Sequence, residues 1–252
     1  MIELYGTEVS APMLPLALGA RGPGVVRVQE WLGLSGRGVV IDGDYGSATA
    51  RAVSEYRASN GFPVGETVDM DVWRCLVLPL AGALFNIAAS GTFAATVVEV
   101  ADQYLSRQAR EIGGDNRGPW VRHFCRGQSV AWCQGFASTV WAGATLLAGG
   151  GSPPLNLTLD GIWCLFVPRM VQEARASGRF ADGRSGTPPK PGAMFFLRGG
   201  PYGYLHVGIV EQAHSDGTMT TIEGNTNHDG SANGYEVCRR VRRTETCDFG
   251  AA

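Results

Sequence analysis

Four short β-prone runs decide the fold class: "AMFFL" (193–197), "YLHVGIVE" (204–211), "TMTTIEGN" (218–225) and "YEVCRRVRR" (235–243). They follow "TPPKPG" (187–192) and are separated by clusters of Gly, Asp and Ser, which is typical of strands joined by turns. Consecutive strands with such connections predict an antiparallel meander near the C-terminus.

Upstream of these strands, apolar residues recur at helical spacing. The segment "TFAATVVEVADQYLSRQARE" (92–111) is amphipathic, and a second helix should begin near Cys133 and run past Val140. The segment "DGIWCLFVPRMVQEARASG" (160–178) also favours a helix, with Pro168 near its start or kinking it. Helices first and a meander afterwards predict an α+β domain, with helices packed on an antiparallel sheet, at residues 92–248.

The N-terminal part predicts a separate three-helix bundle at residues 14–78, followed by a rather apolar linker at 79–91. Ser47 and Asp69 are suited to cap the second and third helices, because their side-chain oxygens can accept backbone N–H groups. The three helical segments are "GVVRVQEWLGL" (24–34), "SATARAVSEYRASNGF" (47–62) and "VDMDVWRCL" (68–76).

Composition narrows the possible partners. The 252 residues are 44% apolar and 17% charged, with a net charge of -2, so we expect a folded chain that binds no nucleic acid. The N-terminus lacks the pattern of a secretory signal, and no apolar run is long enough to span a bilayer. We expect a monomer made in a cytoplasm, without membrane insertion. The basic runs 122–126 and 239–243 are either solvated surface or a contact with an anionic polymer.

A cysteine stands at a predicted helix start in "VAWCQGFAS" (130–138). Unpaired backbone N–H groups and the helix dipole favour a thiolate there, and the same groups can stabilise an oxyanion. Cys133 is therefore the best candidate for a nucleophile. The alternative is a buried apolar cysteine used only for packing.

A histidine and an acid follow on adjacent predicted strands. Alternation places His206 and Gly208 on one face of their strand, which leaves space above the sheet for a ligand. On the next strand Glu223 and Asn225 are two residues apart and should share a face, so either can accept the imidazole N–H. Each residue alone has a structural alternative. Their order along the chain predicts a Cys–His–acid site for nucleophilic catalysis.

The segments "WCQGF" (132–136), "KPGAMFFL" (190–197), "HVGIVE" (206–211) and "IEGNT" (222–226) resemble, in order, the signatures of the CHAP family. These are papain-like, cysteine- and histidine-dependent amidohydrolases and peptidases that cut peptidoglycan. "EIGGDNRGP" (111–119) also resembles a segment of phage members. The resemblance covers residues 92–245.

This resemblance implies roles for the residues named above. Cys133 is the nucleophile, His206 the general base and then acid, and Glu223 the residue that orients His206, with Asn225 assisting. Some family members bind calcium before the cysteine, but this chain offers only Asp115 there, so we expect no metal and no cofactor. Two further residues are candidate substrate contacts: Gln128, which resembles an oxyanion-hole glutamine, and Trp132.

Residues 14–78 resemble the peptidoglycan-binding domain often fused to cell-wall hydrolases. Most of that pattern is the core of the bundle, so the ligand contacts are poorly specified. Asp42 and Tyr45 are candidate contacts, and a purely structural turn explains them equally well.

Together these patterns predict a two-domain peptidoglycan hydrolase of the phage endolysin type, acting on the bacterial cell wall. The bond cut is either the N-acetylmuramoyl-L-alanine amide or an amide of the stem or cross-bridge peptide. The alternatives are a non-catalytic wall-binding or virion protein, and a toxin or effector amidase of the same fold.

Overall fold

The structure is a computed structural model that describes residues 6–85, 91–229 and 233–252. Its N-terminal helices are α1 (Pro23–Leu34), α2 (Ser47–Ser59) and α3 (Met70–Leu76), as predicted. Asp69 caps α3 and accepts a 2.9 Å hydrogen bond from the Val72 N–H. Ser47 does not cap α2, because it is the first helical residue and Gly46 occupies the cap position.

The predicted linker begins as a helix. Residues Leu78–Phe85 form α4, which follows α3 almost directly and buries Leu80 and Ala83. Its apolar composition therefore serves packing. Residues 86–90 of the predicted linker lie outside the described part of the chain. None of the helices in the described ranges is long and apolar enough to cross a lipid bilayer.

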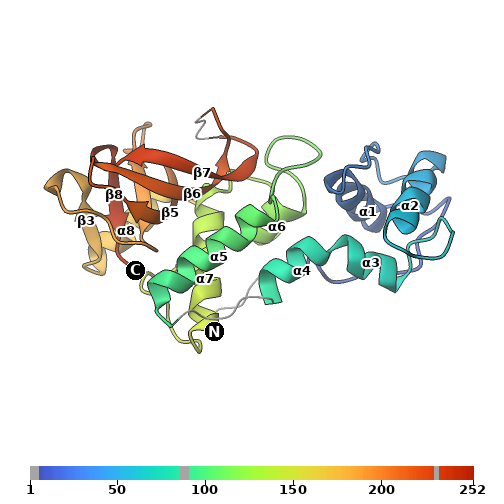
Figure 1. Cartoon of the computed structure of the whole chain (residues 1–252), viewed down its shortest axis with the longest axis horizontal. Coiled ribbons are helices and arrows are strands. Elements are labelled where there is room, and N and C mark those ends of the chain that lie inside the picture. The colour runs from blue at the N-terminus through green and yellow to red at the C-terminus, as the bar shows by residue number, and fades with distance from the viewer. Residues whose placement is uncertain (1–5, 86–90, 230–232) are drawn as a thin grey trace.

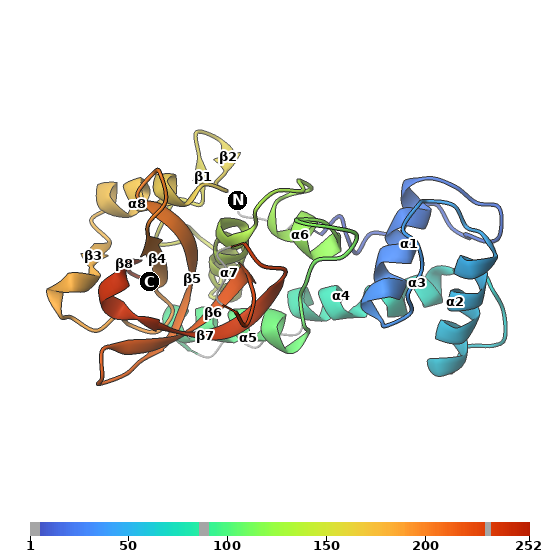
Figure 2. The ribbon, with the colours of Figure 1, turned by 90° about the horizontal axis from the view of Figure 1, so that it is seen from above.

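The C-terminal part combines helices with one large sheet, which confirms the predicted α+β class (Figures 1 and 2). Helices α5 (Phe93–Ser106) and α7 (Cys133–Leu147) pack together, and α7 also lies against the sheet. The short helix α6 (Pro119–Phe124) precedes α7. The predicted start of a helix at Cys133 is correct.

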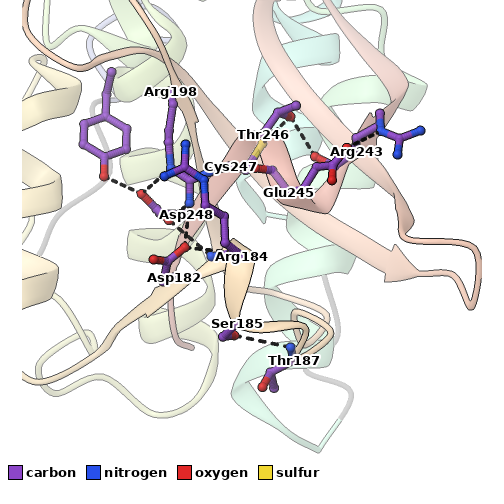
Figure 3. A network of polar contacts seen from close by, with 12 residues as sticks. Asp182, Arg184, Ser185, Thr187, Arg198, Arg243, Glu245, Thr246, Cys247 and Asp248 are labelled. Carbon is purple, nitrogen blue, oxygen red and sulfur yellow. Dashed lines mark hydrogen bonds and ion pairs between the residues drawn. The ribbon is translucent and has the colours of Figure 1, made fainter.

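The six-stranded sheet is antiparallel throughout, with the order β3-β8-β4-β5-β6-β7. The predicted meander forms its β4-to-β7 part, and β8 and β3 extend it beyond β4. Arg198 ties this extension together through hydrogen bonds to Asp182 and Asp248 (Figure 3). The strands are β3 (Phe180–Asp182), β4 (Met194–Arg198), β5 (Tyr204–Ala213), β6 (Thr218–Thr226), β7 (Glu236–Arg243) and β8 (Cys247–Gly250).

The segment 160–178 is only partly helical. Helix α8 (Val167–Ala176) starts just before Pro168, which fits the first turn of a helix because no intrahelical N–H bond is lost there. The preceding residues instead form a small hairpin of β1 (Thr158–Leu159) and β2 (Ile162–Trp163). The apolar run that favoured a longer helix is thus divided between a hairpin and a helix.

The N-terminal helices dock on α6 through a buried ion cluster and apolar packing. Arg122 donates hydrogen bonds of 2.7–2.9 Å to both carboxylate oxygens of Glu8 and of Glu30. Both carboxylates are buried, and the rings of Trp31 and Trp120 meet edge-to-face at 6.1 Å beside them. The apolar core is continuous from α1 to β7, so the two parts of the chain share one interior.

Candidate active site

Cys133 is the first residue of α7, as predicted. The cap position belongs to Trp132, whose side chain makes no capping hydrogen bond, so backbone N–H groups at this end lack a partner within the helix. Cys133 is 6% exposed, so the residue is mostly buried at the start of the helix. The location suits a nucleophile beside oxyanion-stabilising donors.

His206 connects the thiol with an acid. Its ring is fully buried on β5, and Nε2 lies 2.9 Å from Oε2 of Glu223. The other nitrogen, Nδ1, has no fully formed hydrogen bond within the described residues and is left to face the Cys133 thiol. Burial lowers the pKa of His206, but the contacts and charges of Cys133 and Glu223 outweigh burial and raise it to about 9.

The strand alternation predicted for β5 is confirmed. Val207 and Ile209 belong to the core shared with α7, whereas Val210 packs in the smaller apolar cluster on the opposite face. His206 and Gly208 lie on that second face, and a Cβ atom at Gly208 would come within 2.9 Å of the Glu223 side chain. The space over Gly208 that was predicted for a ligand is therefore occupied by the acid beside the imidazole.

Glu223 is fully buried and saturated with donors. Thr221 Oγ1 donates to Oε1 at 2.6 Å, and Arg242 donates to both oxygens, at 2.9 and 2.6 Å. Burial raises the pKa of Glu223, but the bonds from Arg242 and His206 prevail and lower it to about 2. The carboxylate is therefore ionised at neutral pH. The sequence patterns singled out neither Arg242 nor Thr221 for the site.

Asn225 departs from the predicted geometry. Its φ angle is 59°, and the β6–β7 register shifts between Glu223 and Thr226, so simple alternation ends at Glu223 and does not place the two side chains on one face. Its amide is buried, yet neither Oδ1 nor Nδ2 has a hydrogen-bond partner among the described residues. Such an orphaned amide needs a functional or structural reason.

We predict that Asn225→Ala is less stable than Asn225→Gly by about 1 kcal/mol, because alanine is strained in the left-handed region and glycine is not. Both variants lose the amide, so their difference isolates the backbone. Urea unfolding followed by circular dichroism measures it. Equal stabilities would show that the positive φ angle carries no strain.

Trp132, the residue before Cys133, is anchored in the core. Its indole is fully buried, stacks on Phe124 at 5.3 Å and donates a 2.7 Å hydrogen bond from Nε1 to Glu111. Glu111 also accepts the Asn116 N–H at 2.8 Å, which gives the "EIGGDNRGP" segment a structural task. A fully buried indole does not fit the predicted substrate contact.

The remaining candidate contacts lie apart from one another. Gln128 is exposed in a groove of 410 Å³ that Ala131, two residues before Cys133, also lines. Tyr45 is fully buried and donates to the Glu66 carbonyl at 2.6 Å, which favours the structural alternative for this residue. Asp42 is exposed but accepts hydrogen bonds from Gln29 and the Asp44 N–H, both at 2.9 Å. These bonds, the Asp44 one first, hold the pKa of Asp42 below its usual value.

The described residues contain no group of three or more His, Cys, Asp or Glu side chains placed to hold a metal ion. The arrangement supplies a thiol, an imidazole and a carboxylate, in which the imidazole contacts both of the other groups. These are the elements of nucleophilic acyl transfer.

Comparison with known proteins finds one family that matches the segment holding this site. Residues 125–225 match the CHAP domain, whose members are cysteine- and histidine-dependent amidohydrolases or peptidases. The match covers less than half of the chain and includes Cys133, His206, Glu223 and Asn225.

Two other comparisons add little. One solved structure, "The crystal structure of SleB N-terminal domain", is similar at 24% identity over 27% of this chain and 96% of that chain, with a TM-score of 0.27. A likeness with this score carries no argument about function. No curated protein matches the chain.

Proposed function

We propose that this protein is a peptidoglycan hydrolase that cleaves an amide bond through an acyl-enzyme on Cys133. The observation that carries the proposal is the contact sequence from Cys133 through His206 to Glu223, located within the CHAP match. More specifically, we propose that it is a phage endolysin that acts as a monomer on the bacterial cell wall.

The chemistry follows from the charges at the site. With a pKa of about 9, His206 is protonated at neutral pH and can stabilise a Cys133 thiolate. Sγ forms a bond to the amide carbonyl carbon, and the C–N bond breaks as Nδ1 gives its proton to the leaving nitrogen. Water then attacks the thioester and gives a proton to His206. The C–S bond breaks, which releases the carboxylic acid product and restores the Cys133 thiolate beside the protonated His206.

Cys133→Ser should lower the rate of wall lysis by more than about 10³-fold, because the hydroxyl is a much poorer nucleophile in a site built for a thiolate. A turbidity assay on purified sacculi measures this rate, and mass spectrometry of the released fragments identifies the bond cut. Cys75→Ser, at a free thiol on α3, is the control and should lyse normally. Lysis by Cys133→Ser at the wild-type rate would remove the proposal.

The substrate peptide is proposed to bind in the groove next to the loop that precedes Cys133. Residues of the β1–β2 hairpin and the start of α8 line it together with the loop before Cys133. Ile162 is 64% exposed there, and Phe166 is also exposed, so apolar surface is available for a bound chain.

Ile162→Ser and Phe166→Ser should each raise KM about tenfold with little change in kcat, since each removes apolar contact from ground and transition states alike. Kinetics on soluble peptidoglycan fragments provide the measurement. Val241→Ser, at an equally exposed position (64%) on β7, is the control and should leave KM unchanged. A loss confined to kcat would place the substrate elsewhere.

The N-terminal bundle at residues 14–78 is proposed to hold the enzyme on the wall. Its support is the sequence resemblance and its fixed position beside α6. Binding is tested with the full-length Cys133→Ser protein, which should sediment with sacculi without dissolving them.

A further inference from the structure

Within the basic run 239–243 on β7, Arg242 is the arginine that hydrogen-bonds to the site carboxylate Glu223. Its side chain is 13% exposed, whereas that of Arg243 is 66% exposed and pairs with Glu245 (Figure 3). The run was predicted to be either solvated or in contact with an anionic polymer. For Arg242 neither alternative holds, because its charge is turned inward to Glu223.

The contact fixes the orientation of the carboxylate. Arg242 donates from Nε to Oε1 at 2.9 Å and from Nη2 to Oε2 at 2.6 Å. This is the two-point geometry in which a planar guanidinium matches a carboxylate, and it restrains rotation of the carboxylate. Oε2 is thereby held 2.9 Å from Nε2 of His206.

The contact also balances charge in a buried site. Glu223 and His206 are fully buried, and the other titratable groups that act on one or both of them are Arg242, Cys133, Cys238 and Cys247. Burial, as the first cause, raises the pKa of both Cys238 and Cys247 to about 11, so these thiols stay neutral over the working range. The guanidinium is therefore the only permanent positive charge among these groups.

We propose that Arg242 is a positioning residue for the acyl-transfer site, which keeps Glu223 ionised and oriented so that Glu223 presents His206 to Cys133. The inference rests on the proposed function of Cys133 and His206. It extends the site to a residue beyond 225, where the CHAP match ends.

Arg242→Gln tests the proposal through the pH dependence of Cys133 alkylation by iodoacetamide, followed by peptide mass spectrometry. Without the guanidinium, Glu223 loses the charge that keeps it ionised and so supports the His206 imidazolium and the adjacent thiolate less, and the acid limb of the rate profile should move up by about one pH unit. Arg242→Lys keeps the charge and should leave the limb near its wild-type position. Its loss of the two-point contact should lower kcat for hydrolysis several-fold, with KM unchanged.

Arg243→Gln is the matched control, on the same strand but paired outside the site, and it should reproduce the wild-type profile. In a Glu223→Gln background, Arg242→Gln should shift the limb by less than half as much, because the carboxylate through which it acts is gone. The proposal is overturned if Arg242→Gln leaves the limb in place, or if Arg242→Lys moves it equally far. The lysine variant and the double variant keep the test decisive should Arg242→Gln alone fail to fold.

Alkylation requires no wall substrate, so the two proposals fail separately. A shifted limb in a protein that does not digest sacculi would support the role of Arg242 and reject peptidoglycan as the substrate. Digestion of sacculi with an unshifted limb would do the reverse.

Discussion

Glu223→Gln is expected to lower kcat/KM by about 10⁴-fold, the scale seen when the residue that orients a catalytic histidine loses its charge. The carboxylate accepts the Nε2–H of His206 at 2.9 Å and supports its positive charge. A glutamine amide placed there can turn a donor toward the ring and favour the wrong tautomer. Less of the enzyme then holds a protonated Nδ1 next to Cys133.

The same change should move the alkaline limb of the pH–rate profile to lower pH. His206 titrates with a pKa of about 9, raised in part by the Glu223 charge, so activity that needs the imidazolium falls as pH rises through that value. Because this pKa is raised on folding, its contribution to stability is complete below about pH 6.5 and is lost as pH rises through about 9. Without Glu223 both losses begin earlier.

Steady-state kinetics from pH 5 to about 10 measure both effects. Glu211→Gln is the matched control, because Glu211 on β5 also pairs with an arginine, at 2.7 Å from Arg239, but is not among the groups that shift the pKa of His206. It should show wild-type limbs. An unchanged alkaline limb in Glu223→Gln would mean that the carboxylate does not tune the histidine.

Arg122→Met is expected to destabilise the protein by about 3–5 kcal/mol, because it leaves two buried carboxylates without their counter-charge. Glu8 and Glu30 have side chains that are each 5% exposed and share this one guanidinium at hydrogen-bond distance. The loss should appear as a lower denaturant midpoint in urea unfolding. It should also expose the contact between Trp31 and Trp120 to solvent, which tryptophan fluorescence detects.

Arg21→Met provides the comparison for this prediction. Arg21 pairs with Asp44 at 3.0 Å on the surface, where an ion pair contributes less than about 1 kcal/mol. The triple variant with Arg122→Met, Glu8→Gln and Glu30→Gln should recover part of the loss, because no buried charge remains. A single Arg122→Met as stable as Arg21→Met would show that the cluster does not hold the two parts together.

The parts of the fold that follow local periodicity were predictable. The stripe of Val25, Val28 and Leu32 is buried in α1, and α7 begins at Cys133 as the sequence indicates. Alternation on β5 also placed His206 opposite Val207 and Ile209. These features depend on neighbours within one helix or one strand, which a sequence displays directly.

What escaped prediction depends on partners distant along the chain. Arg242 on β7 meets Glu223 on the neighbouring strand β6, and Glu111 meets Trp132 from 21 positions away. Neither pairing leaves a periodic signal. The backbone of Asn225 also broke the alternation rule, because its positive φ angle redirects the strand at that residue.

The basic runs 122–126 and 239–243 also could not be interpreted correctly from the sequence alone. Arg122 and Arg242 each stand in a cluster of positive charge that a sequence marks as surface. In the fold each of them neutralises a buried acid. Composition counts charges, but only the tertiary structure shows which of them are compensated internally.

The shared interior of the two parts limits which peptidoglycan bonds an anchored molecule can reach. A module on a loose tether lets its enzyme search a volume around each anchoring point. Here the Arg122 cluster and the continuous core fix the distance from the bundle to the thiol. A molecule anchored by its bundle would reach bonds at one offset only, so every further cut would require release and rebinding, and overly tight anchoring would slow digestion.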